Sequence, residues 1–362
     1  MKIKTITCHD VYNLGASLQA YALAAYLKAC GHDVQIIDYK PEYLSRHYSL
    51  TAVPNPRYHR PVIRQMYLLA KLPGRLIARR SLRKQRFDAF RQTYLPVTEG
   101  RYHSAEELRQ NCPEADVFIA GSDQIWNPEF PNGRDPAFFL DFVPAGSKRV
   151  SYAASFAVES LPQDVRALVK PWLSGLDAVS VRESSAVTIL EDLGIRGRQV
   201  TDPVFLLPKE HWEGMAHRPV EKDYILVYDF DANPTIAAMA KKLAAETGRR
   251  IISFFPMDGA DAVWQNAGPL EFLGAVLNAG VVISNSFHAT AFSLIFEKDF
   301  YVLNRKEKIN TRMRDLLGSV GLAERLIFHA DELTDSAICW QNVGEALSKQ
   351  IEGSKEFLQT NT

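Results

Sequence analysis

The sequence predicts an α/β protein made of two doubly wound, parallel-sheet domains that face each other across a cleft. Three observations favour this fold. Strand-like apolar runs alternate with helix-like runs along the chain, the alternation restarts after a stretch near residues 204–222, and the strand-like runs end in small or polar residues. Strand, helix, strand alternation is the pattern of a parallel sheet with right-handed crossovers. At 362 residues the chain is long enough for two such domains.

The first domain, residues 1–205, is predicted to be Rossmann-like. It opens with an alternating apolar strand, continues through a loop into a helix with one apolar face that ends at Gly31, and returns as a second strand. Further apolar strands with polar ends follow. In chain order the predicted elements are a strand at 2–8, a loop and helix at 12–31, and strands at 32–41, 115–123, 148–156, 177–183 and 198–207.

The second domain, residues 206–335, repeats the alternation and is predicted to be Rossmann-like as well. A last helical run, within residues 336–362, is expected to pack back on the first domain. The predicted strands span 223–230, 249–256, 281–286 and 299–305, and the predicted helices span 234–248, 268–280, 288–298, 312–322 and 340–359.

Residues 57–91 break the pattern and read as a basic helical insertion. They hold eleven Lys or Arg and one acid, Asp88. Apolar residues recur every three or four positions, and Pro73 with Gly74 is expected to split the helix. Such a stretch suits an anionic membrane surface or a phosphorylated lipid carrier. The alternative is a helical insertion whose basic side is solvated. No recognised module accompanies the charge, so nucleic acid is not an expected partner.

Composition, cysteine content and the N-terminus narrow the class of protein and its expected location. Apolar residues make up 46% and charged residues 23% of the chain, as in soluble globular proteins, and 42 basic residues balance 42 acidic ones. The four cysteines form no CxxC pair, so neither a disulfide framework nor a zinc site is expected. The N-terminus lacks the apolar core of a signal peptide, and no run is long enough to span a bilayer. We therefore expect a cytoplasmic protein, with peripheral contact at the inner membrane face through residues 57–91.

The polar strand ends, taken together, resemble one family. Six motifs carry the resemblance: NLGASLQAYAL, IIDYKP, GSDQIWNP, SVRESSAV, TDPVFLL and SNSFHATAFSLIF. Their order and spacing are similar to those of the polysaccharide pyruvyl transferase family, and the likeness runs from about residue 3 to residue 322.

This resemblance implies a fold like that of the two-domain GT-B glycosyltransferases. It implies phosphoenolpyruvate as the donor substrate and a sugar of a glycan, often lipid-linked, as the acceptor. The product would be a pyruvate ketal that bridges two sugar hydroxyls. A histidine would suit the protonation of the enol ether, and arginine would suit the donor phosphate and carboxylate. The scheme calls for no metal and no cofactor.

His288 stands where the resemblance places the family histidine, and it is the predicted general acid. Family members often have arginine two residues earlier, but this chain has Ser286. Ser286 could offer its hydroxyl and backbone N–H to the donor at a helix N-terminus. The missing positive charge is expected from Lys308 or Arg312, whose alternative is an ordinary solvated helix start. For His288 the alternative is a buried core histidine.

Arg182 matches an Arg-Glu pair of the family and is predicted to bind the donor; its alternative is a surface ion pair with Glu183 or another neighbour. Asn13 and Gly15 belong to the first loop between a strand and a helix. Small residues there allow a ligand close to the backbone, so both are predicted donor contacts, with a tight structural turn as the alternative. The loop has no GxGxxG pattern, so dinucleotide binding is weakly supported.

The GSDQIWNP loop carries the predicted acceptor contacts. Trp126 offers a flat face for a sugar ring, or is a core aromatic. Gln124 and Asn127 supply polar groups to the acceptor. Asp123 is the predicted base for the acceptor hydroxyl, or it caps a following helix. Asp202, before a proline, is interpreted as a brace at the hinge, with a position facing the cleft as the alternative.

Three functions remain open at this point. The favoured one is pyruvyl transfer to a glycan. The second is glycosyl transfer from a nucleotide sugar on the same fold class. The third is a non-catalytic relative that binds a glycan or a lipid carrier after losing the arginine beside its histidine.

Overall fold

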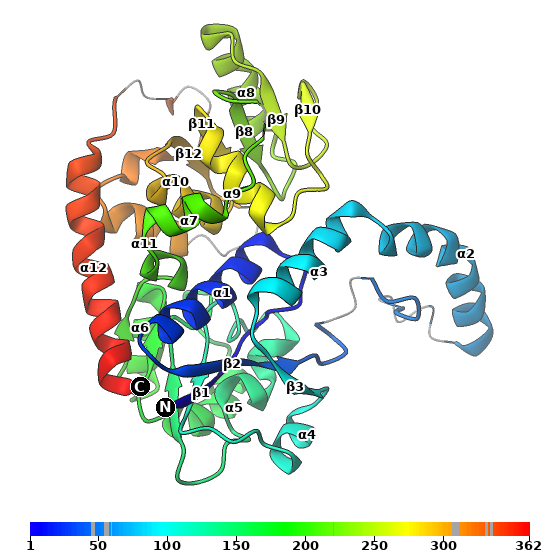
Figure 1. The fold of residues 1–362 in the computed structure, drawn as a ribbon, viewed down its shortest axis with the longest axis vertical. Helices are drawn as coiled ribbons and strands as arrows, with labels where there is room; N and C mark the ends of the chain where they lie inside the picture. The colour runs from blue at the N-terminus through cyan, green and yellow to red at the C-terminus, as the bar shows by residue number, and fades with distance from the viewer. Residues whose placement is uncertain are drawn as a thin grey trace.

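The structure of this protein is a computed structural model. It describes residues 1–44, 48–53, 58, 60–219, 221–305, 311–329, 332–333 and 336–362. Figure 1 shows two halves, each built around its own parallel sheet, with the N-terminal lobe below and the C-terminal lobe above. The predicted α/β class with two parallel-sheet halves is therefore confirmed.

The sheet of the N-terminal lobe has five parallel strands in the order β3-β2-β1-β4-β5. The chain builds outward from β1 to β3 and then crosses back to β4, so the strand order reverses between β1 and β4. Strand β3 of this sheet was not predicted, because the VTEGRY sequence is mostly polar and only Thr98 and Tyr102 of it are buried. The strands are β1 Lys2–Ile6, β2 Asp33–Tyr39, β3 Val97–Tyr102, β4 Val117–Ala120 and β5 Lys148–Ser151. The helices are α1 Leu14–Ala29, α4 Ala105–Gln110, α5 Gln163–Ser174 and α6 Ser184–Asp192.

The sheet of the C-terminal lobe repeats this plan with the order β10-β9-β8-β11-β12-β13, and its order reverses between β8 and β11. All described pairings in it are parallel. Its strands are β8 Ile225–Tyr228, β9 Ile251–Ser253, β10 Ala262–Val263, β11 Val281–Ser284, β12 Asp299–Leu303 and β13 Leu326–Ile327. Its helices are α7 Lys209–Met215, α8 Pro234–Thr247, α9 Pro269–Asn278, α10 Phe287–Ile295 and α11 Thr311–Ser319.

The end of the first lobe differs from the prediction. The expected strands at 177–183 and 198–207 shorten to β6 Ser180–Val181 and β7 Arg198–Gln199, which pair with each other. The chain then forms a 3-10 turn, Pro203–Leu206, because proline lacks the N–H that a strand needs and Asp202 caps the turn through Val204 N–H at 3.1 Å.

Two features join the lobes. One apolar core contains buried side chains of both, including Leu23 of α1 and Phe272 of α9. Helix α12, Trp340–Asn361, runs back along the molecule from the upper to the lower lobe (Figure 1). It meets the N-terminal lobe where Thr201 N–H donates to Ser354 Oγ at 2.9 Å.

The basic insertion forms two helices, α2 Pro61–Arg79 and α3 Leu82–Tyr94. Helix α3 anchors on the core through Phe87 and Phe90. Helix α2 projects from the body as an arm (Figure 1), and none of its side chains that the structure describes is buried. The predicted split at Pro73 is wrong: α2 is continuous and bends instead, since an internal proline can remove one backbone hydrogen bond without ending a helix.

Candidate active site

The loops at the two strand-order reversals face each other between the lobes. Ligands of doubly wound sheets bind beyond the carboxyl ends of strands at such points. Loops after β1 and β4 in one lobe, and after β8, β11 and β12 in the other, line a pocket of about 320 Å³, which we call the interlobe pocket. Six residues predicted from the sequence lie on its wall: Asn13, Asp123, Gln124, Ser286, His288 and Arg312.

His288 lies in the first turn of α10, directly after the buried strand β11. Ser286 is the N-cap of this helix, and its hydroxyl accepts a hydrogen bond from Ala289 N–H at 3.4 Å. The His288 side chain is 10% exposed, and its Nε2 lies 3.6 Å from Asp202 Oδ2. This distance is longer than a hydrogen bond. The imidazole is thus mostly buried but faces the interlobe pocket.

The first helix closes against the other side of the imidazole. Asn13 caps α1 by accepting from Ala16 N–H at 3.1 Å. Gly15, in the first turn, has no room for a side chain: a Cβ there would lie 1.9 Å from His288 Nδ1. The N-terminus of α1 therefore touches the N-terminus of α10, and both helices direct the positive ends of their dipoles at this region.

Asp202 is fully buried and has several partners. It accepts hydrogen bonds from Arg182 Nη1 and, at 3.3 Å, from Ser122 Oγ. Burial alone would raise the pKa of Asp202, but the facing His288 and the charge of Arg182 hold this pKa well below its usual range. Asp202 therefore braces the turn at Val204, as the sequence indicated, and also supplies a negative charge beside His288.

Arg182 does not lie on the wall of the interlobe pocket. Its side chain is 2% exposed and pairs with Asp202, with Asp123 3.8 Å away. Its guanidinium lies 4.8 Å from the centre of the Phe287 ring. The predicted direct contact with a donor in the pocket is not supported by this position. Donor binding by Arg182 stays a prediction. Of the alternative ion pairs, the one with Glu183 does not form, because the Glu183 carboxylate is buried and binds backbone N–H groups of the loop after β5; Arg182 pairs with Asp202 instead, and this pair is buried.

Arg312 supplies a cation to the pocket at the start of α11. It is 7% exposed, and its Nε has no hydrogen-bond partner among the described residues. Burial and the nearby charge of Arg182 lower the pKa of Arg312 to about 10, so the group remains charged at neutral pH. The other predicted cation, Lys308, lies outside the described residues. The backbone N–H of Ser286 is not available to a ligand as predicted, because it donates to Ser284 Oγ at 3.0 Å.

Asp123 lies on the pocket wall, with its side chain 19% exposed. The residue has a left-handed φ of 81°, and its Oδ1 accepts from Gln124 N–H at 2.8 Å. The predicted helix cap is wrong, because the loop through residue 130, all of which the structure describes, contains no helix. Asp123 instead closes a tight turn while one side of its carboxylate faces the pocket.

Two of the predicted acceptor contacts are core residues. Trp126 is fully buried, stacks on Phe139 at 5.3 Å and donates from its indole to the Phe138 carbonyl at 2.9 Å. It has no free face for a sugar, so its alternative reading as a core aromatic holds. Asn127 is fully buried as well and donates to Gln124 Oε1 at 2.7 Å. Of the three predicted acceptor residues, Gln124 alone lines the pocket.

The sequence reasoning missed several residues on the C-terminal wall. Arg305, Phe230 and Asn285 all line the pocket. Arg305 Nη2 lies 3.4 Å from Asp231 Oδ1, and its guanidinium lies 5.1 Å from the centre of the Phe230 ring. Each follows the carboxyl end of a strand, so the rule that led to Asp123 would have found them too.

The comparisons with known proteins agree with this architecture. A putative UDP-N-acetylglucosamine 2-epimerase from Listeria monocytogenes has a TM-score of 0.52 with 8% identity, over 97% of this chain and 90% of that one. A UDP-GlcNAc 2-epimerase from Neisseria meningitidis has a TM-score of 0.48 with 10% identity, over 100% of this chain and 94% of that one. A UDP-GlcNAc 2-epimerase from Methanocaldococcus jannaschii has a TM-score of 0.47 with 12% identity, over 97% of this chain and 93% of that one. The Listeria likeness confirms the predicted GT-B-like fold.

No curated protein matches this chain. The sequence profile described as polysaccharide pyruvyl transferase, however, matches residues 13–307, which include all the residues placed in the interlobe pocket except Arg312 and Met313. Because this match covers most of the chain, the protein belongs to the polysaccharide pyruvyl transferase family.

Proposed function

We propose that this protein transfers the pyruvyl group of phosphoenolpyruvate to a sugar of a glycan, forming a ketal across two hydroxyls. The family membership supports a pyruvyl transferase acting in polysaccharide synthesis. The observation that carries the proposal is the position of His288, whose imidazole faces the interlobe pocket between the buried Asp202 and the start of α1.

The proposed donor site is the part of the pocket beside Arg305 and Arg312. Phosphoenolpyruvate carries a phosphate and a carboxylate, and guanidinium forks bind both groups well. The two helix N-termini that meet at His288 add positive potential for an anion. Ser286 retains a hydroxyl proton to donate, so these groups together replace the arginine that family members often carry at its position.

In the proposed chemistry His288 protonates the methylene carbon of the donor, which leaves positive charge on the adjacent carbon. A sugar hydroxyl adds there and loses its proton, for which Asp123 on the opposite wall is the proposed base. The C–O bond to phosphate then breaks, and a second hydroxyl closes the ketal and releases its proton. Asp202 holds the imidazolium in place electrostatically. Phosphoenolpyruvate enters as a substrate, and the scheme needs no cofactor or metal.

The test is incubation of the protein with phosphoenolpyruvate and a panel of glycan acceptors, including lipid-linked ones. We expect phosphate release that depends on the acceptor, together with an acceptor mass increased by one pyruvate less one water. Transfer of a sugar from a nucleotide sugar would instead indicate a glycosyltransferase. Glycan binding without any turnover would indicate a non-catalytic relative. Either result would contradict the proposal.

Gly15→Ala should reduce turnover by about a hundredfold, because the added Cβ would displace the imidazole of His288 from its present position. The helix itself should tolerate the change, since alanine favours helix more than glycine does. Gly214→Ala on α7 is the matched control, because a Cβ there meets no atom within 4 Å. The measurement is the rate of phosphate release together with the urea midpoint. Unchanged turnover in Gly15→Ala would show that the position of the ring is not critical.

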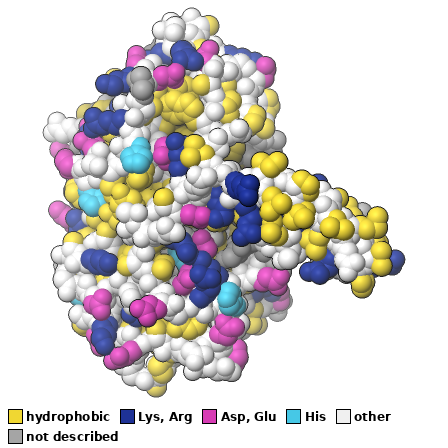
Figure 2. Space-filling view, turned by 45° about the vertical axis from the view of Figure 1, so that its right-hand side comes forward, with side chains coloured by type: hydrophobic (Ala, Val, Ile, Leu, Met, Phe, Trp, Pro, Cys, Tyr) yellow, Lys and Arg dark blue, Asp and Glu magenta, His cyan; other side chains and the backbone are white. Residues whose placement is uncertain are grey.

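We further propose that the arm formed by α2 contacts an anionic membrane surface, which would bring the site to a lipid-linked acceptor. Val62, Met66, Leu69 and Ile77 are each at least 66% exposed and lie on one face of this helix. Its sequence holds Arg and Lys on the opposite face and no acid. Figure 2 shows the hydrophobic side chains along the arm, with Lys and Arg near its base and tip. No helix among the described residues is long and apolar enough to cross a membrane.

Leu69→Glu should lower binding to vesicles of mixed phosphatidylglycerol and phosphatidylcholine at least tenfold, since it places a charge on the face that would enter the lipid interface. Phe328→Glu, at a residue 57% exposed elsewhere, is the matched control. Sedimentation with vesicles measures the effect, and neutral vesicles should bind weakly. If the wild type binds no vesicles, or is a dimer in solution that Leu69→Glu dissociates, the apolar face serves another purpose.

A further inference from the structure

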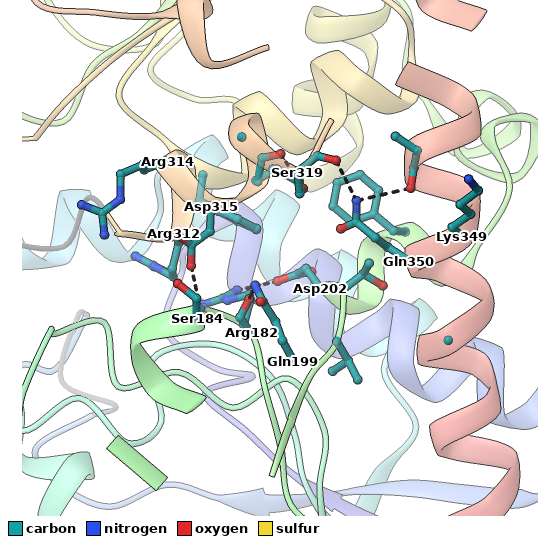
Figure 3. A pocket seen from close by; sticks show the side chains of 18 of the residues that line it. Arg182, Ser184, Gln199, Asp202, Arg312, Arg314, Asp315, Ser319, Lys349 and Gln350 are labelled. Atoms are coloured by element: carbon teal, nitrogen blue, oxygen red, sulfur yellow. Dashed lines mark hydrogen bonds and ion pairs between the residues drawn. The ribbon is translucent and has the colours of Figure 1, made fainter. Parts of the chain in front are cut away.

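A second and larger pocket, of about 820 Å³, adjoins the interlobe pocket. Phe287 and Arg312 line both pockets and so form the partition between them, while His288 lines the interlobe pocket and not this one. We call it the rear pocket. The strand ends of β6 and β7, the start of α6, and helices α11 and α12 form its walls (Figure 3).

The rear pocket is strongly basic. Its wall carries Arg182, Arg198, Arg312, Arg314 and Lys349. Figure 3 shows Lys349 on α12, across the pocket from Arg182 and its partner on the strand ends.

The two acids on this wall are already engaged. Asp202 is paired with Arg182, and Asp315 Oδ2 accepts from Ser184 N–H at 2.6 Å. Arg198 and Arg314 also form exposed ion pairs, each at 3.7 Å, with Glu356 and Glu159, which do not line the pocket. On the pocket wall itself positive charge exceeds negative charge, which favours an anionic ligand.

Two of the cations are buried without complete hydrogen bonding. Arg182 Nε, Arg182 Nη2 and Arg312 Nε form no hydrogen bond with any residue that the structure describes, although Arg182 Nη2 lies 3.8 Å from Asp123 Oδ1. Both side chains are more than nine-tenths buried. Buried guanidinium N–H groups left without a hydrogen bond are costly, and guanidinium groups bind phosphate oxygens well. Because both residues lie on the pocket wall, these N–H groups are suited to a ligand there.

From these features we propose that the rear pocket binds an organic diphosphate. The buried guanidinium groups suit one phosphate, and Arg198, Arg314 and Lys349 around them suit a second. The volume exceeds what a diphosphate alone fills, so the rest of the ligand also has space, against Phe205 and Phe287. This site shares Arg312 and Phe287 with the interlobe pocket but takes its other residues from different elements, and its existence does not depend on pyruvyl transfer.

Titration calorimetry of the full chain with inorganic pyrophosphate tests the proposal. We expect saturable binding at one site, with a Kd that rises at least tenfold in Gly318→Phe, whose side chain would enter the pocket where a Cβ now meets no atom within 4 Å. Lys349→Glu should have a similar effect. The matched controls are Gly344→Phe, an equally open glycine of α12 outside the pocket, and Lys242→Glu on α8; both should bind pyrophosphate normally.

A crossed comparison separates the two sites. Arg305→Ala should weaken phosphoenolpyruvate binding at least tenfold and leave pyrophosphate within twofold, and Gly318→Phe should do the reverse. Failure of phosphoenolpyruvate to bind would contradict the proposed donor but would not affect the proposal that the rear pocket binds a diphosphate. The proposed diphosphate site is contradicted if pyrophosphate does not bind, or if Arg305→Ala weakens pyrophosphate binding as much as Gly318→Phe does. It is also contradicted if inorganic phosphate binds as tightly as pyrophosphate.

Two larger probes identify the source of the diphosphate. Tighter binding of uridine diphosphate than of pyrophosphate would assign the pocket to a nucleotide-linked ligand. Tighter binding of geranyl diphosphate would assign it to a lipid-linked one. Either gain should disappear in Gly318→Phe, and a gain that persists in that variant would place the added group outside the rear pocket and contradict the proposal.

Discussion

His288→Ala is expected to lower kcat for pyruvyl transfer about a thousandfold while changing the Kd for phosphoenolpyruvate by no more than about threefold. A positioned general acid contributes roughly 10²–10⁴ to a rate. The proposed donor anions are instead bound by Arg305, Arg312 and the helix N-termini, which the substitution leaves in place. A discontinuous assay of phosphate release gives kcat, and titration calorimetry gives the Kd for phosphoenolpyruvate.

Two further variants make this result specific to the imidazole. His288→Asn keeps a polar side chain of similar size but cannot act as a proton donor at neutral pH, so it should be as inactive as the alanine variant. His217→Ala, at an exposed histidine whose side chain is 62% accessible, should remain fully active. A normal kcat in His288→Asn, or a loss confined to donor affinity, would remove His288 from the proton transfer.

Arg182→Ala is expected to lower the free energy of unfolding by about 3–5 kcal/mol at neutral pH. The substitution leaves the fully buried Asp202 carboxylate without its guanidinium partner, and an uncompensated buried charge is strongly destabilising. Adding Asp202→Asn should restore much of the loss, because it removes that charge. Lys241→Ala, which breaks an exposed pair with Asp258, is the control and should leave the urea midpoint nearly unchanged, because water screens such a pair. Urea unfolding measures all four proteins.

The penalty of Arg182→Ala should also depend on pH in a defined direction. In the wild type the folded-state pKa of Asp202 is depressed, so its ionisation stabilises the fold above the unfolded pKa of about 3.9, and this contribution is lost as pH falls. Without Arg182 the carboxylate loses one of its compensating charges. The difference between wild type and variant should therefore be largest near pH 7 and shrink as the pH falls below about 4, where Asp202 becomes protonated in the variant before it does in the wild type. A penalty that does not change over this range would mean that the charge of Asp202 is not its cause.

The sequence predicted the path of the chain well, because strands and helices follow from local apolar periodicity. The runs around β1, β4, β8 and β11 were read correctly from their apolar character, and their polar ends led to Asn13, Asp123 and His288, which line one pocket from both lobes. Strand β3 was not predicted, because its polar sequence shows little apolar periodicity.

The roles of individual side chains were harder to predict. Trp126 and Arg182 stand in motifs whose residue types suit ligand binding, yet Trp126 packs in the core and Arg182 lies behind Phe287 on the rear pocket. Residue type alone could not separate these outcomes. The direction in which a loop side chain points depends on the elements that pack around it, and those elements come from distant parts of the chain.

The amino-acid sequence by itself determined the order of the elements, the two parallel sheets and the family, because these depend on patterns within short segments. Only the tertiary structure decided which groups meet. Gly15 lies against His288, Arg182 pairs with Asp202, and Arg312 separates two pockets. Such contacts join residues far apart in the chain, and their burial and charge are set by the packing of the two lobes, which no local pattern encodes.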